Sequence, residues 1–277
     1  ESKYIDDALF ILGNAYYLLN EFYKAEKYFK DLISNHPNSS YILESKLWIE
    51  YVSLEIADID SVLVNIEKIE KDYLQNDLLL DENHFLLHNL KGDIYLKKDD
   101  FKNSISEYEK ALSYLSKKSR KIKIYSKLIL LTERNEDLNK TIEYLDNIYL
   151  NSNNKDTRID SKSKWFSIMR RMEKFDEVIV EIQELLNSSD YSTNSLQEEL
   201  NMELAKTYMQ QEDYKEAKNV FNSIASNASQ KATRSESYYW LGYISLFYSF
   251  EIELAREYFE QSVEERKSSK YAKMSKE

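Results

Sequence analysis

An internal repeat constrains the fold of this chain more than any other sequence feature. Its markers are Gly13, Gly92 and Gly242, the only three glycines among the 277 residues. Each is followed by a small residue twelve or thirteen positions later and by an aromatic residue sixteen or seventeen positions later. In the same order, these followers are the small residues Ala25, Ser104 and Ala255 and the aromatic residues Phe29, Tyr108 and Phe259.

Each repeat reads as two helices joined by a short turn. Around Gly13, apolar residues recur every three or four positions on both sides of Asn20 and Glu21, which predicts two amphipathic helices. A glycine inside a helix costs roughly 1 kcal/mol relative to alanine. We therefore expect each glycine to mark a close approach of two helices. Sheets and tight turns use many glycines and prolines, so a chain with three glycines and one proline is expected to be all-helical.

The register extends over the whole chain as seven units. In the other four repeats, the position equivalent to the glycine is occupied by Glu50, Ile129, Phe166 and Ala205. From Gly13 to Gly242, the intervals between successive markers are 37, 42, 37, 37, 39 and 37 residues. Sixteen residues after each marker, or seventeen after the last, stands an apolar or aromatic residue, as a buried helical stripe requires. The predicted repeats span approximately 5–38, 39–80, 81–117, 118–154, 155–193, 194–230 and 231–268, and 269–277 begins a further helix.

This pattern resembles the tetratricopeptide repeat (TPR), whose first helix is called helix A and whose second is called helix B. Helix A of that repeat carries a small residue, helix B carries a small residue and then an aromatic residue, and a proline follows helix B. Pro37 stands at this last position. The resemblance implies a right-handed α-solenoid of about seven repeats, with 1–277 as a single domain. The enlarged interval holds 72–83, expected as an extra helical turn or a bulged loop. We expect helix pairs at about 5–19 and 22–34, 42–56 and 59–73, 84–97 and 100–115, 119–133 and 138–150, 159–172 and 175–187, 195–210 and 214–226, and 233–249 and 252–267.

The repeat period exceeds the 34 residues of the commonest form. The first 50 residues contain two further features that resemble a particular group of repeat proteins. A Ser-x-Tyr lead-in at 2–4 and a His-Pro-Asn-Ser-Ser-Tyr connection at 36–41 resemble the longer repeats of bacterial cell-envelope proteins. Examples are the BamD-type lipoprotein of outer-membrane assembly and the Tol–Pal-associated repeat protein. This resemblance implies a periplasmic or outer-membrane-associated scaffold, whose lipid anchor would lie upstream of Glu1. A cytoplasmic location is the alternative.

The two ends of the sequence resemble each other. Ser269-Lys270-Tyr271 repeats the Ser2-Lys3-Tyr4 lead-in to a helix A. We therefore expect 1–277 to be a window of a longer array, or an eighth helix A to be truncated. On this expectation the last helix-B stripe, at Ala255, Phe259 and Ser262, is less buried than its equivalents Phe29 and Leu32.

Charge and composition exclude several function classes. The formal net charge of −11 argues against nucleic-acid binding and against an anionic membrane surface. No run approaches the ~18 apolar residues of a spanning helix, so direct membrane insertion is not expected. The chain has no cysteine, and its glycines are too far apart for a phosphate loop. His84 and His88 have a metal-binding spacing without a third ligand, and we expect packing instead. We expect no catalytic residue, no metal and no cofactor, and therefore no enzyme.

Two sets of residues are candidates for binding a protein or peptide partner. In the TPR family, helix A lines the concave face, and carrying its positions over gives Phe10, Asn14, Tyr17, Leu47, Tyr51, Asn89, Asp93, Tyr239 and Tyr243. Asn14 matches the family's carboxylate clamp, but Asp7 and Phe10 do not match its flanking positions. Separately, a basic run could meet an acidic partner through Lys117, Lys118, Arg120, Lys121 and Lys123.

Two functional hypotheses follow. The first is a non-enzymatic scaffold that binds a peptide or partner protein on its concave face, in the bacterial cell envelope. The second is the recognition region of a larger cytosolic regulator or enzyme whose catalytic domain lies outside this sequence.

Overall fold

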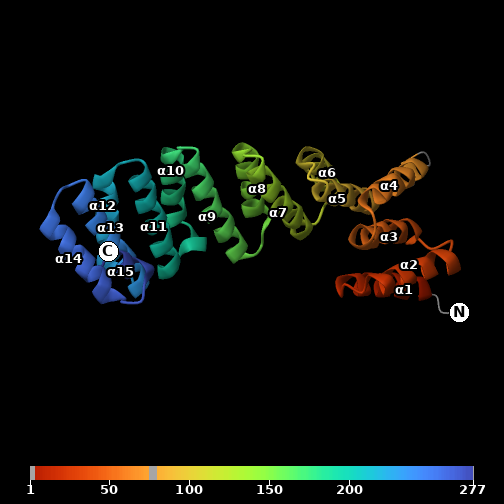
Figure 1. Ribbon diagram of the computed structural model, residues 1–277, viewed down its shortest axis with the longest axis horizontal. Helices are drawn as coiled ribbons and strands as arrows, with labels where there is room; N and C mark the ends of the chain where they lie inside the picture. The colour runs from red at the N-terminus through yellow and green to blue at the C-terminus, as the bar shows by residue number, and fades with distance from the viewer. Residues whose placement is uncertain (1–3, 75–79, 277) are drawn as a thin grey trace. The chain divides into compact units, whose positions relative to one another are not determined.

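The computed structural model describes residues 4–74 and 80–276, and these residues form helices and no strand (Figure 1). Fourteen helices make seven pairs, and the two helices of each pair pack against each other. A 3₁₀ turn, η1 (Ser189–Tyr191), and a short helix, α15 (Lys270–Met274), complete the described elements. The paired helices are α1 (Ile5–Leu18), α2 (Phe22–Asn35), α3 (Ile42–Ile56), α4 (Ile59–Leu74), α5 (Asp81–Lys97), α6 (Phe101–Ser113), α7 (Lys118–Arg134), α8 (Leu138–Asn151), α9 (Lys155–Arg171), α10 (Phe175–Leu186), α11 (Asn194–Gln210), α12 (Tyr214–Asn227), α13 (Lys231–Phe247) and α14 (Ile252–Glu265).

The predicted all-helical fold of seven helix pairs is confirmed. Helix ends lie within two residues of their predicted positions except at two helix starts: α5 begins at Asp81, three residues earlier than predicted, and α9 begins at Lys155, four residues earlier. The side chain of Asn154 accepts a hydrogen bond from the Thr157 N–H, and this cap allows the helix to start there. Within the enlarged interval, α4 runs to Leu74 and α5 starts at Asp81; the rest of that interval, 75–79, lies outside the described residues.

The chain divides into two compact units, Glu1–Asn153 with α1–α8 and Asn154–Glu277 with α9–α15. The division falls at the predicted boundary between the fourth and fifth repeats. A single solenoid over 1–277 stays a prediction. No helix within the described ranges is long and apolar enough to cross a bilayer.

The glycines lie where an aromatic ring of helix B touches the backbone of helix A. A Cβ atom on Gly13 would lie 2.5 Å from the ring of Phe29, and one on Gly92 would lie 2.5 Å from the ring of Tyr108. The rings of Phe29 and Tyr108 are fully buried. The expected close approach of the two helices is therefore present, and ring packing offsets the low helix propensity of glycine.

The turns between paired helices need a left-handed backbone, yet none of them uses glycine. In six of the seven pairs, the residue seven positions after the marker (eight in the last pair) has φ between 55 and 64°. Asparagine and aspartate tolerate this region better than other non-glycine residues, and the six positions hold only one of each. The remaining four are three glutamates and one exposed phenylalanine; the complete set is Asn20, Asp99, Glu136, Glu173, Glu212 and Phe250.

The last helix B meets the expectation of reduced burial only in part. Phe259 is partly exposed, whereas its equivalent Phe29 is fully buried. The expectation is wrong for Ala255 and Ser262, which are buried. The Ser262 hydroxyl donates to the carbonyl oxygen of Ser235 at 2.7 Å, and this contact between α14 and α13 covers it.

The ring contacts predict unequal effects of Gly→Ala substitutions. Gly13→Ala and Gly92→Ala should each destabilise the fold by about 1–3 kcal/mol, because a fully buried ring cannot move away from the new methyl group. Gly242→Ala should cost less, since Phe259 is partly exposed and free to shift. Chemical denaturation measures all three. Equal losses for Gly13→Ala and Gly242→Ala would contradict this account.

Candidate functional site

A pocket in the first unit lies on the first helices of four consecutive pairs, α1, α3, α5 and α7. Its volume is about 280 Å³. We call it the helix-A pocket. It is lined by Tyr17, Trp48, Tyr51, Phe85, Leu86, Asn89, Arg120, Lys123, Ile124 and Lys127.

One side of the helix-A pocket is aromatic. The ring of Tyr17 makes T-shaped contacts with the rings of Trp48 and Tyr51, at 5.1 and 6.3 Å between centroids, and the ring of Trp48 lies 5.0 Å from that of Tyr51. Burial, with the nearby charges of Glu55 and Asp93, raises the pKa of Tyr17 to about 12. Its phenol is therefore neutral near pH 7, so this side of the pocket offers uncharged aromatic surface.

The base of the helix-A pocket is held by a chain of hydrogen bonds. The Tyr51 hydroxyl donates to the carbonyl oxygen of Leu86 at 3.3 Å and accepts from the Asn89 amide. The Lys127 ammonium donates to Asn89 Oδ1 at 3.1 Å and to Asp93 Oδ1 at 2.6 Å. Because each of these groups already has a partner within the chain, they position the pocket more than they offer free contacts.

The three cations of the helix-A pocket differ in how far they are neutralised. The Arg120 guanidinium makes a bidentate pair with Glu82, at 2.5 and 2.7 Å, and lies 4.2 Å from the centroid of the Phe85 ring. Lys127 is paired with Asp93. Lys123 is exposed, and no carboxylate of residues 4–74 or 80–276 forms an ion pair with it. Lys123 is thus the cation best placed to meet an anionic group of a partner.

The structure joins residues that the sequence assigned to two separate candidates. Tyr17, Tyr51 and Asn89 came from the helix-A face, whereas Arg120 and Lys123 came from the basic run, and all five line one pocket. Their helices are successive first helices, whose contacts join residues 38 apart in sequence, as in the Asn89–Tyr51 and Arg120–Glu82 pairs. The basic run therefore continues the helix-A face.

Other predicted positions in the first unit do not line the pocket. Leu47 is fully buried in the core and is not accessible to a partner, which corrects its assignment. Phe10 stacks on Tyr41 at 4.5 Å, and the Asn14 amide donates to the carbonyl oxygen of Phe10 at 3.0 Å. Asp93 lies behind the pocket as the partner of Lys127. Three lysines of the basic run are also absent from the lining: Lys117, Lys118 and Lys121.

The two remaining predicted residues belong to the second unit. Tyr239 is buried and its ring lies 5.9 Å from that of Phe259. Tyr243 is partly buried and its ring lies 4.7 Å from that of Phe247. Both take part in aromatic packing within their own unit.

Sequence reasoning missed five lining residues: Trp48, Phe85, Leu86, Ile124 and Lys127. One signal was available for Trp48 and Lys127, because each stands nineteen residues after a helix-B aromatic of the repeat pattern, Phe29 and Tyr108. Phe85 stands at the same offset from Ile66, the helix-B residue of the second repeat. Leu86 and Ile124 carry no pattern that separates them from core residues.

The two helical histidines pack as aromatic groups. His84 and His88 stack on Tyr114, at 4.5 and 5.7 Å between ring centroids, and His88 Nδ1 lies 2.7 Å from Glu107 Oε2. Burial opposes ionisation of Glu107, but hydrogen bonds from His88 and Lys110 hold its pKa at about 2. Within the described ranges, no group of three or more histidine, aspartate or glutamate side chains is arranged to hold a metal ion.

The low pKa of Glu107 predicts a loss of stability in acid. Above pH 4.5, its usual value, Glu107 is ionised in both folded and unfolded chains, and its native partners stabilise the fold. As the pH falls from about 4.5 to about 2, the unfolded chain takes up a proton first, and at most about 3 kcal/mol is lost. Glu107→Gln should remove this part of the pH dependence, measured by urea unfolding between pH 2 and 7. An unchanged acid slope would count against the assignment.

The hydrogen-bond chain predicts different roles for two lysines of one helix. Lys127→Met should destabilise the fold by about 1 kcal/mol or more, because Asp93 and Asn89 lose a donor. Lys123→Met should change stability by less than about 0.5 kcal/mol, as is usual for an exposed side chain. Thermal unfolding of both variants measures this contrast, and similar losses would show that Lys127 has no structural role.

Comparisons with known proteins agree with this architecture. A family model described as "Tetratricopeptide repeat" matches residues 7–39, and a second model with the same description matches residues 87–114 and 198–229. These segments fall in the predicted first, third and sixth repeats. No curated protein matches the chain.

Two solved structures resemble the chain along almost its whole length. The C-terminal part of a TPR repeat-containing protein from Cytophaga hutchinsonii is 14% identical, with a TM-score of 0.59, and the alignment covers 97% of this chain and 99% of that one. The apo form of RapI is 14% identical, with a TM-score of 0.56, and the alignment covers 98% and 80%. At this identity the likeness shows the fold. The chain therefore contains tetratricopeptide repeats arranged in an all-helical fold.

Proposed function

We propose that this protein is a non-enzymatic interaction module whose helix-A pocket binds a segment of a partner protein. The observation that carries the proposal is the composition of the pocket, which combines an aromatic side with the exposed Lys123, a cation that has no ion-pair partner among the described residues. Aromatic rings offer large contact area with few rotatable bonds, and they are enriched at protein interfaces. A cation beside them adds orientation and selects the charge of the partner.

The pocket size indicates what part of a partner enters it. At about 280 Å³ it lies just below the usual 300–1,000 Å³ range of small-molecule sites, so it suits one large side chain of a peptide or helix. We propose that an apolar side chain enters beside Tyr17 and Trp48, and that a carboxylate of the same segment meets Lys123. The partner segment is therefore both apolar and acidic.

The titration behaviour of the lining residues supports binding over catalysis. Burial raises the pKa of Tyr51 well above its ordinary value, as it does for Tyr17. Both phenols are protonated near pH 7, as they would be at the ordinary tyrosine pKa of about 10, so neither acts as a base there. Arg120 and Lys127 are engaged in ion pairs. The lining thus offers contacts for recognition and no nucleophile with an adjacent base.

We also propose a place in the bacterial cell envelope, supported by the resemblance of the first 50 residues to envelope repeat proteins. The alternative is the recognition region of a larger cytosolic regulator or enzyme. The full-length gene distinguishes them: an upstream signal with an acylated cysteine supports the first, and an appended catalytic domain supports the second.

Comparative capture from the native organism tests the pocket. Immobilised wild type, Lys123→Glu and Lys118→Glu are incubated with the same extract, and bound proteins are quantified by mass spectrometry. Both lysines are exposed on α7, but only Lys123 lines the pocket. Reversing the charge at Lys123 should reduce partner recovery about 3- to 10-fold, whereas the Lys118 variant should match wild type. The site would lie elsewhere if wild type and both variants recovered the partner equally, or if both variants recovered equally less of it than wild type.

A further inference from the structure

A second pocket in the first unit lies between α3 and α4, and its lining residues are distinct from those of the helix-A pocket. Its volume is about 390 Å³, within the usual range of small-molecule sites. We call it the α3–α4 pocket. It is lined by Lys46, Ile49 and Glu50 on α3 and by Asn65, Lys68, Ile69 and Asp72 on α4.

The second helix pair does not have the glycine–ring contact that closes the first and third pairs. Glu50 stands at the marker position, where those pairs have a glycine. Sixteen residues later stands Ile66, in place of an aromatic ring. A carboxylate therefore occupies the position where the two helices of a pair otherwise approach closely, and the α3–α4 pocket lies beside it.

Glu50 is a buried carboxylate without a counter-ion. The residue is only 8% exposed, and no lysine or arginine of residues 4–74 or 80–276 forms an ion pair with it. Its hydrogen bonds come from the Asn65 amide, 3.3 Å from each carboxylate oxygen. Burial raises the pKa of Glu50 against the lowering effect of these hydrogen bonds, and the charge of Glu26 adds to the rise. Because a buried charge without a partner is costly, Glu50 would gain from a cation in the pocket.

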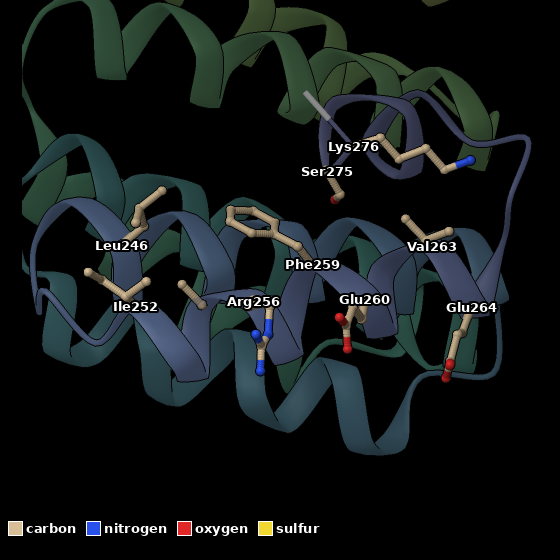
Figure 2. A pocket seen from close by; sticks show the side chains of 10 residues that line it. Leu246, Ile252, Arg256, Phe259, Glu260, Val263, Glu264, Ser275 and Lys276 are labelled. Carbon is tan, nitrogen blue, oxygen red and sulfur yellow. The ribbon is translucent and has the colours of Figure 1, made fainter.

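The charged side chains of the larger pocket beside α14, in the second unit, lie at the surface instead (Figure 2). These residues are Arg256, Glu260, Glu264 and Lys276, and all four are exposed. Water solvates exposed charges of both signs, so this lining does not select a ligand. The α3–α4 pocket differs because its carboxylate is removed from water.

The α3–α4 pocket has a carboxylate at one end and an ammonium at the other. Glu50 marks the first end, where it meets Asn65. Lys46 marks the second, where its ammonium lies 3.2 Å from the Tyr73 hydroxyl. These two contacts join α3 and α4 in reverse order, so the helices are antiparallel. Lys46 and Glu50 are one helical turn apart, about 6 Å along α3.

The rest of the lining is apolar or carries a net positive charge. Ile49 and Ile69 each stand between the two ends on their own helix. Apart from Glu50, the charged lining residues are two lysines, Lys46 and Lys68, and one exposed aspartate, Asp72. Neither lysine forms an ion pair with a carboxylate of residues 4–74 or 80–276.

We propose that the α3–α4 pocket binds a small zwitterion whose ammonium and carboxylate are separated by a short aliphatic chain. The ammonium donates to the Glu50 carboxylate, and the carboxylate of the ligand accepts from Lys46. The methylene groups between them lie against Ile49 and Ile69. A compound with a single charge would leave either the buried carboxylate or the lysines without a partner.

A series of ω-amino acids serves as the probe. Glycine, 4-aminobutanoate, 5-aminopentanoate and 6-aminohexanoate differ only in the chain between their charges, whereas pentanoate and pentylamine each carry one charge. Isothermal titration calorimetry with the intact 277-residue chain should show one of the three longer amino acids binding at least about tenfold more tightly than glycine, pentanoate or pentylamine. If none of the series binds, or if a singly charged analogue binds as tightly, the proposal is wrong.

Glu50→Gln tests the carboxylate while keeping its shape. Binding of the best ω-amino acid should weaken at least about tenfold, because the ammonium loses its anionic partner. The melting temperature should not fall, since the variant removes a buried charge that has no counter-ion. The control is Glu67→Gln, at an exposed position of α4 outside the lining, and it should bind like wild type. Equal affinities of the two variants would contradict the proposal.

Lys46→Met tests the other end of the pocket, and melting temperature confirms that it is folded. It should weaken binding of the best ω-amino acid about tenfold and leave the weak binding of pentylamine unchanged, because pentylamine has no carboxylate. Lys123→Met alters only the helix-A pocket and should leave both affinities unchanged. Loss of binding in Lys123→Met would show that the probe occupies the helix-A pocket and would overturn the proposal.

Discussion

The contact between an aromatic ring of helix B and a glycine of helix A supports much of the rest of this structure. In the first and third pairs the ring sits against the glycine backbone so closely that a methyl group has no room. Phe29 and Tyr108 thereby fix how each helix pair closes, and they present their other face to the next pair. Trp48 and Lys127 cover that face, so one local contact is repeated along the chain, as expected when repeats contact mainly their neighbours.

The helix-A pocket is a consequence of this repeated contact. In the first unit, Trp48 and Lys127 each cover a helix-B ring and also line the helix-A pocket, so the residues that join repeats shape the site.

The helices themselves were predictable because their signals are local. Apolar or aromatic residues at a constant distance from each marker position indicate the second helix of every pair, and small residues and aromatic rings make the pattern clearest in the first, third, sixth and seventh pairs. The ends of most helices follow directly. The exception at α9 is also local, since the cap made by Asn154 could be read as either a turn or a helix start. The left-handed turns were less visible. Glutamate and phenylalanine fill positions where glycine would have been the obvious sign.

The sequence by itself thus determined the fold class, the number of helix pairs and the position of the helix-B rings. Only the tertiary structure decided that Leu47 is core while the adjacent Trp48 lines a pocket, and that Lys123 belongs beside Tyr51. The periodicity of one helix shows which stripe is apolar, but it does not show how the stripe is shared between two neighbours. That division depends on how successive first helices pack, in contacts between residues about 38 apart.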